Sequence, residues 1–281
     1  MMADPLSPSL ASRFARHVVL MSLALIYLLP FVWMLSISLK PASEIFDAGF
    51  NLIPREWAAW ENYSAALTRV PLLRYLLNGV VVCAGILVVQ IALAFPAAYC
   101  FAKIKFRGHD LAWGLTMLSL MVPFQATAIP LYIFLYHLGL LDSYSALILP
   151  FIASAFGMFM FRQAIKVIPD DLIHASRLDG MGEFELVWRV LLPACLPTVI
   201  AFSIFSVVWH WNDYFWPLLV INTQDLATPP LGTMFFANEE SGNDYGPLMA
   251  GTVLITIPLV VFFLFAQKRF IEGVTFSGVK A

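Results

Sequence analysis

Six apolar stretches, each long enough to cross a lipid bilayer as a helix, divide this 281-residue chain. A bilayer requires roughly 20 apolar residues per helix, and only a helix or a closed barrel satisfies its own backbone in lipid. Hydrophobic residues make up 60% of the chain and charged residues 12%, about half of what soluble domains carry. The sequence therefore predicts an all-α integral membrane protein, a single domain of six spans at about 18–39, 75–101, 111–138, 146–165, 197–221 and 247–267.

The first stretch favours a retained helix over a cleaved signal peptide. Arg13 and Arg16 precede it, as in a signal peptide, but its apolar run exceeds the usual 7–15 residues and no small-residue cleavage site follows. Lys and Arg gather on one side of the six-span arrangement, whereas the last loop on the other side, Asn222–Gly246, has neither. The positive-inside rule then predicts that both termini and the segment 168–193 are cytoplasmic.

The segment 168–193 reads as two short helices joined by a turn. Asp170 and Asp171 follow Pro169, which is a typical helix start. Gly180 and Gly182 end that helix, and a second one runs from about Glu183 to Pro193. The apolar face of the pair has three alternative partners: the membrane helices of this chain, the lipid interface or another protein.

Polar and aromatic residues inside two spans are candidates for a substrate path. In the third span Pro123 and Pro130 flank two polar side chains, and broken helices often line transporter sites. Near the outer end of the fifth span, a carboxylate lies among aromatic rings, a combination that suits sugars. A kinked helix and an interfacial aromatic anchor are the alternative interpretations. The candidates are Gln125, Thr127, Trp209, Asn212, Asp213 and Tyr214. Asn78 and Gln90 are interpreted as helix-packing polar residues.

Several function classes are disfavoured. The net charge of −2 argues against nucleic acid, and the scattered His and Cys residues form no metal-ligand cluster. The chain has no G-x-x-x-x-G-K-[ST] loop, so we expect no ATP hydrolysis on it. No nucleophile–base pair or metal cluster is evident at membrane depth, so the sequence does not indicate a membrane enzyme. An ion-coupled secondary transporter is the main alternative, although Asp213 is the only acidic residue inside a span.

The order of residues in 168–193 resembles the cytoplasmic "EAA" loop of ATP-binding-cassette importer permeases. Here the pattern is His174-Ala175-Ser176, then Gly180, then Leu192-Pro193. Five further blocks are similar to the carbohydrate branch, specifically to the second, six-helix permease of maltose-type importers. They are "LPFVWMLSISLKP", "FPAAYCFAKIKFRG", "LGLLDSYSALILP", "WHWNDYFWPLLV" and the tail "FIEGVTFSGVKA" at 270–281. The resemblance implies the type I importer (MetI-like) permease fold, with N- and C-termini in the cytoplasm.

In that family the loop forms a coupling helix that contacts the partner ATPase. Carried onto this chain, the resemblance implies ATPase-coupling roles for Asp171, His174, Ala175, Ser176, Arg177, Asp179 and Gly180. His174 and Ser176 depart from the family pattern, because a glutamate and an alanine usually stand there. A compensating change in the partner, or an aspartate of this segment, would have to replace the glutamate.

The resemblance also implies a function and a set of partners. The chain would be the permease subunit of an importer for a carbohydrate or carbohydrate-like solute, in the bacterial cytoplasmic (inner) membrane and surrounded by membrane lipid. Its expected partners are a homologous second permease, an ATPase dimer and an extracytoplasmic solute-binding protein. The chain itself would bind no cofactor, since ATP and Mg²⁺ would bind the ATPase. The sequence does not identify the sugar.

Overall fold

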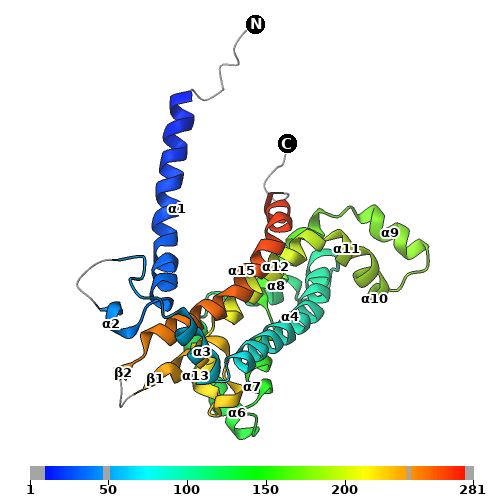
Figure 1. Cartoon of the computed structure of the whole chain (residues 1–281). Helices are drawn as coiled ribbons and strands as arrows, with labels where there is room; N and C mark the ends of the chain where they lie inside the picture. The colour runs from blue at the N-terminus through cyan, green and yellow to red at the C-terminus, as the bar shows by residue number, and fades with distance from the viewer. Residues whose placement is uncertain (1–9, 47–50, 239–241, 276–281) are drawn as a thin grey trace. The chain divides into compact units, whose positions relative to one another are not determined.

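The computed structural model describes residues 10–46, 51–238 and 242–275, and most of them are helical (Figure 1). The chain forms two compact units, residues 1–70 with 235–254 and residues 71–234 with 255–281. The expected tail 270–281 lies outside the described residues from position 276 onward.

The first unit holds the N-terminal helix and a small polar cap on its end. Asn62 Nδ2 donates to the carbonyls of Ser38 at 3.0 Å and Lys40 at 2.8 Å, so it satisfies acceptors that the end of α1 leaves free. Ala237 pairs with Asn243, and Asn238 with Gly242, in an antiparallel hairpin. The elements are α1 (Leu10–Ser38), α2 (Ala42–Ile45), α3 (Ala59–Thr68), β1 (Ala237–Asn238), β2 (Gly242–Asn243) and the first turns of α15 (Tyr245–Thr275), which continues into the second unit.

The second unit contains the other helices. Its elements are α4 (Leu72–Lys103), α5 (His109–Ser119), α6 (Phe124–His137), α7 (Tyr144–Ile148), η1 (Leu149–Phe151), α8 (Ala155–Val167), α9 (Asp170–Leu178), α10 (Glu183–Glu185), η2 (Leu186–Leu191), α11 (Leu192–Ala194), α12 (Leu196–Trp211), α13 (Phe215–Val220), η3 (Gln224–Leu226), α14 (Pro229–Gly232) and η4 (Thr233–Phe236), the last of which crosses the boundary between the units.

Three helices of the described chain are continuous and apolar enough to cross a membrane: Phe14–Ser38 of α1, Leu72–Lys103 and Tyr245–Gln267 of α15. Three bent pairs of helices pass the same test, with bends of 98° between α5 and α6, 45° between α7–η1 and α8, and 82° between α10–α11 and α12. The candidate spans therefore number three, or up to six if each bent pair crosses once. The all-helical membrane fold expected from the sequence is confirmed.

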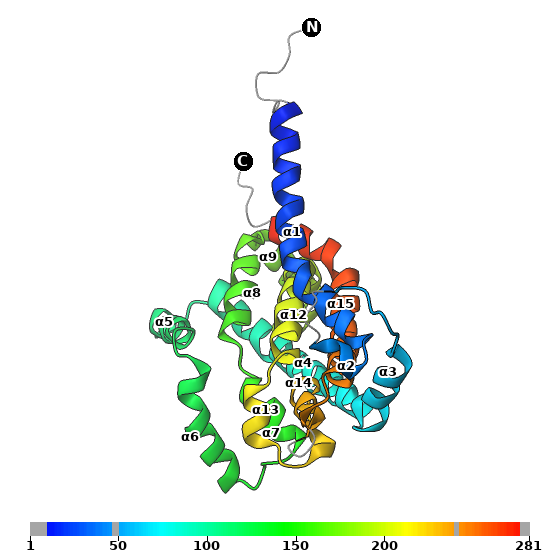
Figure 2. The ribbon, with the colours of Figure 1, turned by 60° about the vertical axis from the view of Figure 1, so that its left-hand side comes forward.

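Three of the expected spans are not single continuous helices, and one of them, 146–165, breaks at residues 152–154 between η1 and α8. The stretch 111–138 breaks between Ser119 and Phe124, where Pro123 has extended backbone and caps α6 (Figure 2). Proline disfavours the helical conformation of the residue before it, which accounts for a break at this position. Pro130 lies inside α6 without ending it. The stretch 197–221 likewise breaks at residues 212–214, between α12 and α13.

The core of the second unit joins α4, α8 and α12, which lie side by side (Figure 2). The ring centroids of Phe95 and Phe161 are 5.3 Å apart, and those of Phe161 and Phe202 are 5.0 Å apart. All three rings are at most 2% exposed. Gly157 permits this close contact, because a Cβ there would lie 2.9 Å from the ring of Phe202.

Two buried amides tie α4 to its neighbours. Gln90 donates to the carbonyl of Phe151 at 2.8 Å and accepts from the hydroxyl of Ser206 at 2.7 Å. Asn78 donates to the carbonyls of Asp225 and Ala227, both at 2.9 Å. These contacts confirm that Asn78 and Gln90 are helix-packing residues.

Replacing Gln90 by leucine will leave the Ser206 hydroxyl and the Phe151 carbonyl without this partner inside the helix bundle. We expect a loss of about 1–2 kcal/mol in the free energy of unfolding, measured by thermal or detergent denaturation of the purified protein. Gln163 on α8 is exposed, so Q163L is the matched control and should unfold like the wild type. Equal stability of Q90L and Q163L would contradict the role assigned to Gln90.

Candidate functional site

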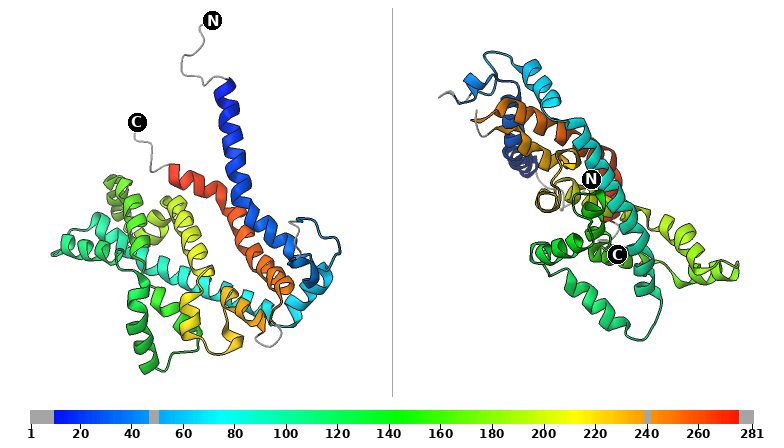
Figure 3. Two further views of the ribbon diagram at one scale, coloured as in Figure 1. Left: turned by 90° about the vertical axis from the view of Figure 1, so that its left-hand side faces the viewer. Right: turned by 90° about the horizontal axis from the view of Figure 1, so that it is seen from below.

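The segment between α8 and α12 contains a helical hairpin that projects from one end of the second unit (Figures 1 and 3). Its first helix, α9, begins at Asp170 after Pro169, with Asp170 and Asp171 in the first turn and Arg177 in the last. Carboxylates at the start and a cation at the end both complement the helix dipole. Gly180 follows with φ of 85°, the left-handed conformation that glycine adopts without strain.

The second half of the hairpin does not end at Pro193 as the sequence predicts. The chain runs from α10 through a π-helical stretch, η2, into α11, and bends only at Cys195. Pro193 lies in the first residues of α11.

The hairpin has one buried and one exposed apolar face. Ile173, Leu186, Val187 and Leu191 are at most 4% exposed and belong to the same core cluster as Phe95 of α4. On the other side, the exposed apolar side chains are Leu172 at 42%, Leu178 at 87% and Phe184 at 78%. The hairpin therefore packs on the membrane helices of its own chain and still presents an apolar surface outward.

Three side chains connect the hairpin to α4. The Tyr99 hydroxyl donates to Glu183 Oε2 at 2.6 Å, and Arg177 Nε donates to Glu183 Oε1 at 2.9 Å. Arg177 closes the triangle by donating to the Tyr99 hydroxyl at 3.0 Å. The hydrogen bond with Glu183 raises the pKa of Arg177. We call Tyr99, Arg177 and Glu183 the triad; it fixes the turn between α9 and α10 against α4.

A second connection lies at the start of α9. Lys103 is the last residue of α4. Its Nζ donates to Asp170 Oδ1 at 2.7 Å and to the carbonyl of Ile168 at 2.6 Å. The hydrogen bond from Lys103 lowers the pKa of Asp170, so the carboxylate stays charged at neutral pH. The hairpin is thus attached to α4 at both ends of α9.

Most of the residues predicted to contact an ATPase lie on the exposed side of the hairpin. Ser176 differs: it is 5% exposed, and its hydroxyl donates to the carbonyl of Leu172 at 2.8 Å. Arg177 is exposed, but its guanidinium is bonded to the other two residues of the triad. The exposed residues of the predicted set are Asp171, His174, Ala175, Arg177, Asp179 and Gly180.

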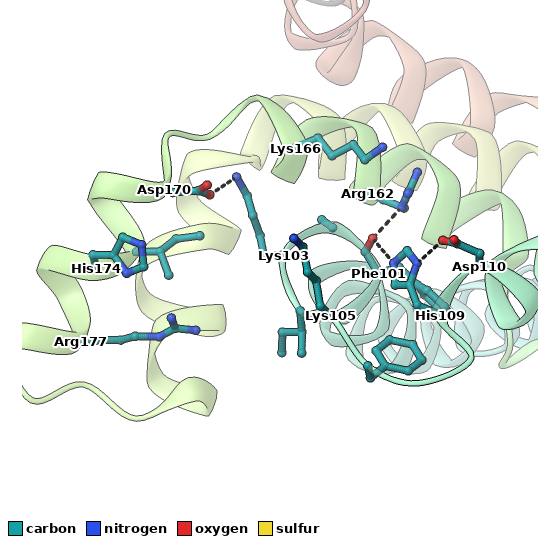
Figure 4. A pocket seen from close by; sticks show the side chains of 14 residues that line it. Phe101, Lys103, Lys105, His109, Asp110, Arg162, Lys166, Asp170, His174 and Arg177 are labelled. Carbon is teal, nitrogen blue, oxygen red and sulfur yellow. Dashed lines mark hydrogen bonds and ion pairs between the residues drawn. The ribbon is translucent and has the colours of Figure 1, made fainter.

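A cavity of about 710 Å³ opens between the hairpin, the end of α8 and the loop from α4 to α5 (Figure 4). We call it the basic pocket, because five cationic side chains and two carboxylates line it. The cations are Lys103, Lys105, Arg162, Lys166 and Arg177, and the carboxylates are Asp110 and Asp170. His109 and His174 also line it.

The predicted substrate-path residues are spread over α6 and the end of α12. Gln125 and Thr127 are exposed on α6, and the Thr127 hydroxyl donates to the carbonyl of Phe124 at 2.9 Å. Trp209 is 68% exposed, and Tyr214 is 37% exposed. The Asn212 amide donates to the carbonyl of Val208 at 2.8 Å.

Asp213 faces inward in the break before α13. Its carboxylate accepts the Trp216 N–H at 3.3 Å, in the manner of a helix cap. It also lines a cavity of about 10 Å³ together with His210 and Thr228. Nδ1 of His210 and the Thr228 hydroxyl are buried without a hydrogen-bond partner in the described part of the chain. Within the same residues, no three His, Cys, Asp or Glu side chains are grouped as metal ligands.

The hairpin, its attachment to α4 and the apolar helices can be compared with known proteins. A family described as "Binding-protein-dependent transport system inner membrane component" matches residues 90–275, well over half of the chain. The chain belongs to this family. It is therefore a membrane permease component of a transport system and not an enzyme, and family membership decides against the ion-coupled secondary transporter.

Named relatives match more than nine-tenths of the chain. The chain is 34% identical to the arabinooligosaccharides transport system permease protein AraQ of Bacillus subtilis, over 95% of this chain and 96% of the relative. It is 30% identical to the lactose transport system permease protein LacG of Rhizobium radiobacter, over 92% and 93%. A solved bacterial ABC transporter involved in the import of alginate has the same fold, with a TM-score of 0.81 at 22% identity, covering 94% of this chain and 99% of that one. The permease fold expected from the resemblance is confirmed.

A substitution at Gly180 tests the geometry of the hairpin. Valine at this position must adopt φ of 85°, which costs roughly 1–3 kcal/mol for a residue with a Cβ. We expect G180V to speed hydrogen exchange of the amides between α9 and α10 and to lower uptake, while the protein still inserts.

Gly182 is the matched control for this substitution. It has φ of −74°, and a Cβ there meets nothing within 4 Å, as is also true at Gly180. G182V should therefore exchange and transport like the wild type. If the two variants behaved alike, the left-handed turn would not be what shapes the hairpin.

Proposed function

We propose that this permease moves a carbohydrate or carbohydrate-like solute inward across the membrane by alternating access, driven by a separate ATP-binding-cassette ATPase. Family membership supports binding-protein-dependent transport. The names of the relatives, which concern arabino-oligosaccharides and lactose, support a sugar.

The observation that carries the proposal is the two-sided hairpin. A segment that transmits movement needs an outer surface for the driving subunit and a rigid attachment to the helices that move. The exposed Leu178 and Phe184 supply the first, and the buried Ile173 and Leu186 supply the second. ATP binding would close the ATPase dimer, displace the hairpin and thereby reorient the membrane helices.

The triad makes this attachment directional. Because Tyr99 is 2% exposed and lies on α4, its hydroxyl is held by the core of the unit. Glu183 and Arg177 are on the hairpin, so a force applied to the α9–α10 turn reaches α4 through two charge-assisted hydrogen bonds. Such bonds are directional, and they resist sliding better than apolar contact alone.

The proposal includes a set of partners and an orientation. The hairpin would face the cytoplasm in a bacterial inner membrane, as the distribution of Lys and Arg favours. A homologous second permease would complete the path, and an external solute-binding protein would deliver the solute. ATP and Mg²⁺ would be bound by the ATPase, because this chain carries no phosphate-binding loop motif.

For the substrate path the structure favours aromatic contact over carboxylate contact. Trp209 is exposed and able to stack on a sugar ring, or to sit at the membrane interface as an anchor. Asp213 and Asn212 already bond to neighbouring backbone groups. Gln125 and Thr127 remain candidates through their exposure on α6.

Replacing Tyr99 by phenylalanine removes only the hydroxyl of the triad. We expect it to cost about 1 kcal/mol in the free energy of unfolding. We also expect substrate-stimulated ATPase activity and uptake to fall about fivefold or more, in the range of typical coupling energies. Both are measured on the transporter reconstituted in vesicles.

Tyr144 provides the matched control. Its hydroxyl donates to Asn78 Oδ1 at 2.6 Å, so Y144F removes a tyrosine hydroxyl that is bonded at the opposite end of α4. The two variants should lose similar stability, but only Y99F should lose coupling. Equal losses of coupling in both variants would mean that the triad is merely structural.

Reconstitution tests the function as a whole. Vesicles that contain the permease, its homologous partner and the ATPase should accumulate labelled sugar only with external binding protein and internal ATP, and vanadate should stop uptake. A thermal-shift screen of the cognate binding protein selects the sugar. Uptake that follows a proton gradient without ATP would overturn the proposal.

A further inference from the structure

The basic pocket holds more positive charge than its own residues neutralise. Lys103 is bonded to Asp170, and Arg177 to Glu183. Arg162 donates to the carbonyl of Phe101 at 2.8 Å, and its guanidinium lies 4.1 Å from the ring centroid of Trp113. These contacts hold three of the cations in fixed positions around the pocket.

Two further cations in the pocket are free. Lys105 and Lys166 both line it and are exposed, and neither has an ion pair or hydrogen bond within the part of the chain that the structure describes (Figure 4). Asp110 is already bonded to His109, and Asp170 to Lys103. An anion that enters the pocket would therefore meet two unneutralised ammonium groups.

The pocket lies where apolar helices end. Lys103 is the last residue of α4, His109 the first of α5, and Val167 the last of α8, and each of these helices belongs to a candidate span. Lipid phosphates occupy this level of a membrane. A row of exposed leucines runs from the pocket along α5: Leu111 at 70%, Leu115 at 58% and Leu118 at 57%.

We propose that the basic pocket binds the phosphate headgroup of an anionic phospholipid, whose acyl chains lie along the exposed leucines of α5. Basic pockets between membrane helices are known to accept such headgroups. A volume of about 710 Å³ is within the usual range for bound small molecules and exceeds what inorganic phosphate alone would fill. The adjoining leucines favour a lipid over a free phosphate or an acidic side chain of a partner protein.

The bound headgroup would join the loop between α4 and α5 to the end of α8. Lys105 is in the loop between α4 and α5, and Lys166 is at the end of α8, one turn before the hairpin. A phosphate between them would hold this loop against the base of the hairpin. The anionic lipid content of the membrane would then influence how the hairpin is held.

Photo-crosslinking tests the site on the full-length protein. The protein is reconstituted in phosphatidylcholine vesicles doped with photoactivatable phosphatidylglycerol, and crosslinked peptides are mapped by mass spectrometry. We expect crosslinks in residues 101–118 and 162–177, and a decrease of about tenfold or more in K105Q/K166Q. Photoactivatable phosphatidylethanolamine, which carries no net charge, should label these residues weakly.

A matched double variant controls for charge. Arg107 and Arg189 are exposed and do not line the pocket, so R107Q/R189Q removes the same charge from the same end of the unit. It should keep the crosslinks. Equal loss in both double variants, or equal labelling by the two lipids, would overturn the proposal.

Two further arms distinguish other anions. If inorganic phosphate in the buffer abolished crosslinking by competition at constant ionic strength, the site would serve free phosphate instead of lipid. If K105Q/K166Q kept all lipid crosslinks but no longer co-purified with the ATPase, the pocket would accept an acidic group of that protein. Either result would refute the lipid assignment.

Discussion

The contact between Phe95, Phe161 and Phe202 is the interaction on which the second unit depends. Helices in lipid gain little from burying apolar surface against one another, so their association relies on close packing and a few hydrogen bonds. The three rings provide that packing between α4, α8 and α12, and Gly157 lets the helices approach. Ile173 and Leu186 of the hairpin join the same cluster. The hairpin is therefore positioned by the membrane helices themselves.

Polar side chains add direction to this packing at three levels of α4. Asn78 and Gln90 bond to backbone carbonyls of neighbouring segments, and Tyr99 and Lys103 bond to the hairpin. Each bond joins α4 to a segment far away in the sequence. Apolar contacts alone would allow helices to slide or rotate, whereas these bonds fix both the depth and the rotation of α4 against its partners.

Local features of the hairpin were predictable from the sequence. Pro169 with two aspartates marks the start of α9, and Gly180 marks its end, because these signals act over only a few residues. The triad was not predictable in the same way. Tyr99 lies within a long apolar run, and its partner Glu183 is 84 residues further along the chain. A tyrosine two residues before the "FAKIKFRG" sequence is the only local sign of it.

Apolar composition also could not predict which spans are continuous helices. By composition, 111–138 and 197–221 are single apolar runs, although the helices break before Phe124 and after Trp211. Pro123 signals the first break, but Pro130 is an equally strong signal and lies within an intact helix. The burial of one side chain also differs from the expectation. Ser176 lies beside exposed residues in the sequence, yet it points inward because helical geometry turns it toward the core.

The length of α4 has a consequence for how movement can cross the protein. Asn78 and Tyr99 are 21 residues apart on one helix, or about 32 Å at the rise of an α-helix. Pro96 lies between them, close to the Tyr99 end, and removes one backbone hydrogen bond from the helix. Pro96 thus divides α4 into a long segment that contains Asn78 and a short segment that contains Tyr99. A displacement of the hairpin would bend the helix at Pro96, while the long segment stays anchored through Asn78.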